Sequence, residues 1–207
     1  TAIYPEYLND FNIMICPSDP KAIEHVYTQG KWFVNGDAEA GIVDPCAFNC
    51  VSYLYMPLAL TGEPGHDMLA PGANPNDPSI PPDSSAVGQW INPEFVQAMM
   101  GAVHAVATGA RDTYDYDLPI GSDGDVLYRL REGIERFLIT DINNPGAAQQ
   151  AQSTIPVMWD LVNIKLENFN HVPGGANVLF LDGHVDFHKY PGKFPVTRTF
   201  AVASSLF

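Results

Sequence analysis

HVPGGANVLFLDGHVDFHKY, residues 171–190, is the stretch of sequence that decides the fold of this chain. Asp182-Gly183 lies between two alternating apolar runs, and this arrangement is the strongest short-range signal for a β-hairpin. Neighbouring residues of a strand point to opposite faces, so Val185 and Phe187 are expected on one face and His184, Asp186 and His188 on the other. The stretch predicts a C-terminal hairpin with a type I′ turn, one buried face and one wet face.

The remaining patterns predict an α+β domain. Capping and periodicity indicate three helices and three further strands. The helices are expected at about 20–29, 93–107 and 126–138, and the strands at 31–34, 51–56 and 155–160. The helix at 93–107 is apolar on most faces, so substantial burial is expected. We expect one globular domain over residues 1–207, with an antiparallel sheet packed on two or three helices, and a loop-rich insertion at about 57–91.

The charge of the chain restricts its partners. It carries 24 acidic and 10 basic residues, for a net charge of −14. Nucleic acids and anionic membrane surfaces would be repelled, whereas cations would be attracted. No apolar run reaches the roughly 18 residues that would span a membrane. The sequence opens at Thr1 with no signal-peptide pattern, so a processed or truncated chain is expected.

Three cysteines allow a disulfide with one thiol left over. Cys46 and Cys50 flank three residues, and a bridge across so short a loop is geometrically demanding. A bridge from Cys16 to either of the others would close a longer loop. Any disulfide would imply an oxidising compartment. No histidine lies close in sequence to complete a zinc site, so zinc is disfavoured.

The acidic loop at 111–125 is a candidate calcium site, because calcium prefers several carboxylate and carbonyl oxygens on a flexible loop. We select Asp117, Asp123 and Asp125 as its ligands. The spacing does not fit an EF-hand. The alternative, which the residues favour, is that these aspartates form turns and cap the following helix.

His171, Asp160 and Asp182 are candidates for a metal or acid–base cluster of a hydrolase. The chain contains no HExxH or GxSxG motif, and no nucleophile in a recognisable setting. The favoured alternative is that His171 forms hydrogen bonds within the hairpin and Asp182 serves the turn.

Five landmarks together resemble bacterial pseudopilin-like proteins of the prepilin-type processing-associated family, which are similar to the major pseudopilin of type II secretion. They are CPSDP at 16–20, SYLYM at 52–56, LREGIERFLITDINNPGA at 130–147, PVMWD at 156–160 and HVPGGANVLFLDGHVDF at 171–187. The family has nine residues between a histidine and Asp-Gly, whereas ten separate His171 from Asp182. The family's cleavage motif and long apolar N-terminal helix have no counterpart in these residues, so the helix was removed, or it lies outside this sequence, or assembly proceeds differently.

The resemblance implies a pilin-like domain that is a structural subunit of an extracellular or cell-surface filament or pseudopilus, and not an enzyme. Its partners would be identical subunits in a homopolymer, and such proteins often hold calcium. It also implies a structural role for His171, Asp182 and Gly183. Two alternatives stay open, namely a secreted module that binds calcium or glycan and a metal-dependent hydrolase.

The C-terminal tail is more apolar than the end of a domain needs, and an exposed apolar strand invites pairing with another chain. We expect the tail to contact a neighbouring subunit, so that deleting residues 195–207 would abolish assembly while leaving the domain folded. The alternative is that the tail closes the domain's own sheet. Its apolar residues are Phe194, Val196, Phe200, Val202 and Phe207.

Overall fold

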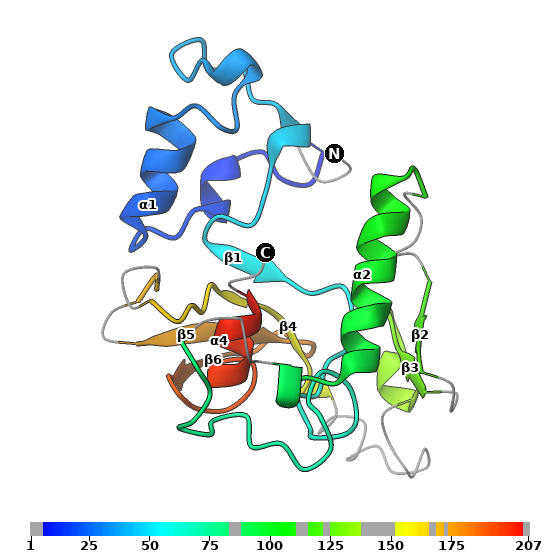
Figure 1. Cartoon of the computed structure of the whole chain (residues 1–207). Helices are drawn as coiled ribbons and strands as arrows, with labels where there is room; N and C mark the ends of the chain where they lie inside the picture. Colours follow the sequence, from blue (N-terminus) through cyan, green and yellow to red (C-terminus); the bar gives the residue numbers. More distant parts are fainter. Residues whose placement is uncertain are drawn as a thin grey trace.

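The computed structural model describes residues 6–82, 88–110, 116–121, 125–137, 152–165, 169–171 and 174–204. Its main sheet has four antiparallel strands in the order β1–β4–β5–β6. Their bounds are Tyr53–Tyr55, Pro156–Asp160, Gly175–Phe180 and Val185–Lys189. A second, two-stranded sheet pairs β2 (Leu118–Ile120) with β3 (Asp125–Leu127). The predicted α+β class is confirmed (Figure 1).

The C-terminal hairpin is present, but its turn differs from the predicted type. Strand β5 pairs with β6 from Gly175↔Lys189 to Leu179↔Val185. The Gly183 N–H donates to the Phe180 carbonyl at 2.9 Å, and Gly183 has a φ of +89° whereas Asp182 does not have positive φ. This is a three-residue loop that ends in a left-handed glycine. The predicted type I′ turn is wrong, because only one of its two central residues adopts positive φ.

Burial across β6 is the reverse of what its apolar pattern suggests. Val185 and Phe187 are 60% and 47% exposed, whereas His188 is 8% exposed. The Phe180 ring lies 5.8 Å from the His188 ring on the same side of the sheet. The hydrophobic side of β6 therefore faces away from the core, and we call this side of the sheet the open face. The opposite side is the core face.

The C-terminal tail covers the core face. It forms α4 (Arg198–Ser204), which lies across β5 and β6 (Figure 1). Val196, Phe200 and Val202 are buried in the main hydrophobic cluster together with Trp159 of β4. The expectation that this tail contacts a neighbouring subunit is wrong for these residues, because they close the domain's own core; Phe207 lies outside the described residues.

The insertion at 57–91 also contributes buried side chains to the core. Leu58, Leu60 and Leu69 are fully buried, and Trp90 is 8% exposed. Backbone hydrogen bonds connect the insertion to the start of α4, as the Thr199 N–H donates to the Pro75 carbonyl at 3.0 Å. Its prolines and glycines shape a long loop, and its apolar residues anchor that loop to the sheet.

Helix α2 (Pro93–Ala107) begins and ends as predicted. Asn92 accepts a hydrogen bond from the Glu94 N–H at 3.0 Å, and Pro93 occupies the first turn. Its burial was overestimated, however, because Ala102 is the buried residue of this helix in the described structure. Since Val96, Met100 and Val103 are spaced as neighbours on one helix face and are 43%, 61% and 42% exposed, they form an exposed apolar stripe.

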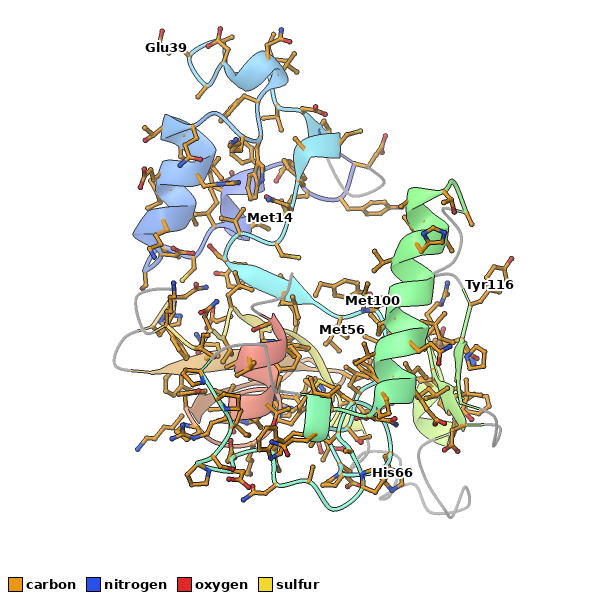
Figure 2. All side chains as sticks on the ribbon, in the orientation of Figure 1. Met14, Glu39, Met56, His66, Met100 and Tyr116 are labelled. Atoms are coloured by element: carbon orange, nitrogen blue, oxygen red, sulfur yellow. The ribbon has the colours of Figure 1, made fainter. Side chains whose placement is uncertain are left out.

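The N-terminal residues form a small unit with a core of its own. Asp19 caps α1 (Pro20–Ile23), which continues as a π-helical turn from Glu24 to Thr28. Trp32 is fully buried at the centre of this unit. Figure 2 shows Glu39 at the far tip of the unit and Met14 at its base, near β1. The chain then enters the sheet through β1.

The third predicted helix, at 126–138, is wrong in its described part. Asp125–Leu127 is strand β3, and a short 3₁₀ helix covers Ile134–Phe137. The apolar residues that suggested a helix are divided between two cores, because Leu127 packs beside α2 and Ile134 packs with Ile155. Among the described residues, no helix combines the length and apolar character needed to cross a bilayer.

Candidate functional site

Three potential metal ligands from distant parts of the sequence converge on the open face. The Cys16 Sγ lies 3.7 Å from the His171 Nε2, and the same nitrogen lies 3.1 Å from the Asp160 Oδ2. The three ligand atoms all fall within 4.8 Å of one another. Cys16 and Asp160 are 2% and 1% exposed, and His171 is partly buried. The cluster is therefore a compact site with one side turned toward solvent.

Each ligand is placed by a different local structure. Cys16 lies between the 3₁₀ helix Phe11–Met14 and α1, and its N–H donates to the Ser52 Oγ at 2.9 Å. Asp160 is the last residue of β4. His171 precedes β5 and forms an isolated bridge with Gly175. Closing the hairpin against β4 thus brings Asp160 and His171 together, and docking the N-terminal unit adds Cys16.

The Asp160 carboxylate is held by two asparagines. Its Oδ2 accepts hydrogen bonds from the Asn177 backbone N–H at 2.7 Å and from Asn177 Nδ2 at 2.9 Å. Asn170 Nδ2 donates to Oδ1 at 3.4 Å and also to the Ser52 carbonyl. These contacts fix the carboxylate's orientation and compensate for the desolvation of its charge.

A pocket of about 470 Å³ opens in front of the cluster. Its walls come from both units of the fold, with Ile13, Pro17 and Ser18 on the N-terminal side and Tyr53, Leu179 and Val185 on the sheet. Burial raises the pKa of the Tyr53 phenol to about 12, and the neighbouring Cys16 and Asp160 add to this effect. Tyr53 therefore stays protonated at neutral pH and presents a neutral hydroxyl to the cluster.

The geometry argues against a thiol nucleophile activated by a His–Asp pair. In such a triad the carboxylate binds one ring nitrogen and the nucleophile binds the other. Here Asp160 and Cys16 both approach Nε2 of His171, and Asn177 Nδ2 lies 3.1 Å from the same nitrogen. Two arrangements fit this geometry, either a hydrogen-bonded network of these groups around Nε2, or a metal ion bound at the point where Cys16, Asp160 and His171 meet.

Of the hydrolase candidates selected from the sequence, the structure brings together two of three. Asp160 and His171 are in contact, but Asp182 lies in the hairpin turn at the other end of β5. There Asp182 accepts a hydrogen bond from the His184 N–H at 3.1 Å, and this bond lowers the pKa of its carboxyl. Asp182 and Gly183 thus serve the turn, whereas His171 belongs to the cluster.

Two of the three aspartates selected for calcium, Asp117 and Asp125, lie apart in the structure. Asp117 immediately precedes β2, and Asp125 begins β3 at the opposite end of the small sheet, about 10 Å away at roughly 3.3 Å per residue. Asp117 accepts hydrogen bonds from the Arg131 guanidinium and the Arg129 N–H, and these lower the pKa of its carboxyl. Asp123 lies outside the described residues. Calcium at this loop stays a prediction.

Cys16 is the ligand that sequence reasoning missed. Sequence proximity suggested pairing among Cys16, Cys46 and Cys50, yet all three are free thiols in this structure. Cys46 and Cys50 are exposed, whereas Cys16 faces His171, 155 residues further along the chain. The available signal was the CPSDP motif itself, because Asp19 caps α1 and thereby fixes the turn that carries Cys16.

Comparisons with protein-family models, with curated proteins and with solved structures found no match. The site is therefore interpreted from its own geometry.

Proposed function

We propose that this chain is a structural subunit that assembles with copies of itself into an extracellular, pilin-like filament or pseudopilus. The observation that carries the proposal is the open face of the main sheet. One row of apolar side chains crosses all four strands on this face, because Tyr55 pairs with Met158, Met158 with Leu179, and Leu179 with Val185. We call these four residues the apolar row.

The apolar row is exposed at both ends. Tyr55 and Val185 are 55% and 60% exposed, and Phe187 beside Val185 is 47% exposed. Val185 and Phe187 also belong to β6, which is an edge strand of the sheet. An edge strand with exposed apolar side chains favours association with another chain. This surface takes the role that the sequence assigned to the tail.

A filament needs two different surfaces, because a head-to-tail contact that does not close generates an open chain of subunits. The apolar stripe of α2, formed by Val96, Met100 and Val103, supplies a second surface on a separate element. Packing the stripe of one subunit on the apolar row of the next would be such a head-to-tail contact, and it would give a filament where the rotation between subunits does not close a ring. The net charge of −14 opposes this association at low salt, so added salt or a bound cation should promote it.

Sedimentation velocity over a range of protein concentrations, with electron microscopy of the heaviest fraction, tests the proposal. The double variant Val185→Ser/Phe187→Ser and the single variant Met100→Ser should each weaken assembly while leaving the monomer folded. Ile42→Ser is the matched control, because Ile42 is 62% exposed and lies outside both surfaces. A wild-type chain that stays monomeric at every concentration and salt level would contradict the proposal.

Chelation provides a separate test of the predicted calcium. A drop in melting temperature on adding a calcium-selective chelator, with recovery on adding calcium, would support a structural calcium ion. An unchanged melting temperature would remove calcium from the proposal and leave the assembly surfaces in place.

A further inference from the structure

We propose that Cys16, Asp160 and His171 bind a zinc ion through Sγ, Oδ2 and Nε2. The inference does not depend on self-assembly, because it rests on the cluster within one chain. It also differs from the calcium predicted at the acidic loop in both ligands and location.

Two of the three distances between the ligand atoms match a tetrahedral zinc site, and the third, between Sγ and Oδ2, is within 4.8 Å. Typical zinc bonds of about 2.3 Å to sulfur and about 2.0–2.1 Å to nitrogen or oxygen place tetrahedral ligands about 3.6 Å (S to N) and about 3.3 Å (N to O) apart. The corresponding distances here are 3.7 Å between Sγ and Nε2 and 3.1 Å between Nε2 and Oδ2. An ion could therefore bind with little movement of the backbone.

The chemistry of the ligands selects the metal. Calcium and magnesium prefer oxygen ligands throughout, and they would leave the thiol and the imidazole unused. A thiolate, an imidazole and a carboxylate together suit zinc. On binding, the Cys16 thiol loses its proton to solvent as the Zn–S bond forms, and His171 binds through the lone pair of a neutral ring.

The surroundings also fit a zinc site. Asn177 and Asn170 hold Asp160 through hydrogen bonds, which is the kind of support that orients metal ligands. The three protein ligands leave a fourth tetrahedral position on the side of the pocket, where a water molecule or a small anion can bind. Closed structural zinc sites have four protein ligands, so this site would stay open to an exchangeable ligand.

The test is a zinc titration of the reduced, chelator-treated full chain, followed by calorimetry and by the absorption of the cobalt-substituted protein. We expect one zinc per chain and a thiolate-to-cobalt charge-transfer band. Cys16→Ser should abolish the band, and His171→Asn should weaken zinc binding at least about tenfold. The matched control is Cys46→Ser/Cys50→Ser, which removes the two exposed thiols and should retain both the stoichiometry and the band.

Folding is checked separately, because Cys16 is buried and its substitution could disturb the N-terminal unit. The side chain of His171 is 30% exposed, so His171→Asn should keep the circular dichroism spectrum of the wild type without metal. Absence of stoichiometric zinc in the wild type would overturn the proposal, and the cluster would then be a hydrogen-bonded network only. Loss of the site in the Cys46→Ser/Cys50→Ser variant, or its full retention in folded His171→Asn, would also overturn it.

Discussion

Phe200→Ala is the substitution that best separates a tail that closes the core from a tail that contacts a neighbour. Phe200 is 5% exposed in α4. Its ring packs edge-on against Trp159 at 5.4 Å and against Phe194 at 5.7 Å. Truncating this side chain removes the ring from the core and leaves a cavity between the helix and the sheet.

The expected loss follows from these contacts. Returning a buried aromatic side chain to water costs about 2–3 kcal/mol, and each edge-to-face pair adds about 0.5–1.5 kcal/mol. Measured Phe→Ala substitutions in cores cost about 3–5 kcal/mol, which agrees with this sum. A domain whose total stability is about 5–15 kcal/mol would be severely weakened. Deleting residues 195–207 should therefore prevent folding, in contrast to the sequence-based expectation.

Urea denaturation followed by tryptophan fluorescence measures the effect. With a slope of about 2 kcal/mol/M, a loss of about 4 kcal/mol lowers the midpoint by about 2 M. Phe187→Ala is the matched control, because its ring is 47% exposed on the open face, so only about half of the burial contribution is lost and stability should fall by about 1 kcal/mol. If Phe200→Ala costs under about 1 kcal/mol and instead abolishes self-association, the assignment of the tail to the core is refuted.

Three further substitutions test local features of the fold. Gly30→Ala should cost about 1–3 kcal/mol more than Gly41→Ala in urea denaturation. Both glycines have positive φ, but only a Cβ at position 30 would meet the Gly36 carbonyl oxygen, at 1.9 Å. Equal losses of stability would contradict that contact. Gly183→Ala should lower the stability by about 1–2 kcal/mol, because a φ of +89° is strained for alanine although the space around the residue is open. An unchanged melting temperature would argue against the left-handed turn. Asp117→Asn should cost about 1 kcal/mol at neutral pH, because it weakens the pairing with Arg131. Because the pKa of Asp117 is lowered in the folded state, this stabilisation is present above the ordinary aspartate pKa of about 3.9 and is lost as the pH falls through the folded-state value. The stabilities of wild type and variant should therefore converge in urea titrations at strongly acidic pH. A difference in stability that persists there would exclude the ion pair as its cause.

Local sequence signals predicted the elements whose ends are marked by capping or turn residues. Asn92-Pro93 fixed the start of α2, because a capping side chain and a proline in the first turn both favour that boundary. The position of the hairpin was also predictable, since its Gly183 occupies the left-handed position that the loop requires. These features depend on residues within a few positions of one another.

Long-range packing decided the features that sequence patterns mispredicted. The apolar residues of 126–138 have helical spacing, yet Leu127 pairs in a sheet with Leu118 and Ile134 packs in a different core. The pattern of β6 does not reveal which of its faces meets α4. Cys16 and His171 meet only after the N-terminal unit docks on the sheet, and no spacing rule connects residues so far apart.

X-ray absorption spectroscopy of the zinc-loaded full chain tests most directly the central claim about the site, that three distant side chains hold one ion. We predict a coordination shell with a single sulfur at about 2.3 Å and nitrogen or oxygen ligands at about 2.0–2.1 Å. A shell without sulfur, or one with two or more sulfurs, would contradict a site built from Cys16, Asp160 and His171.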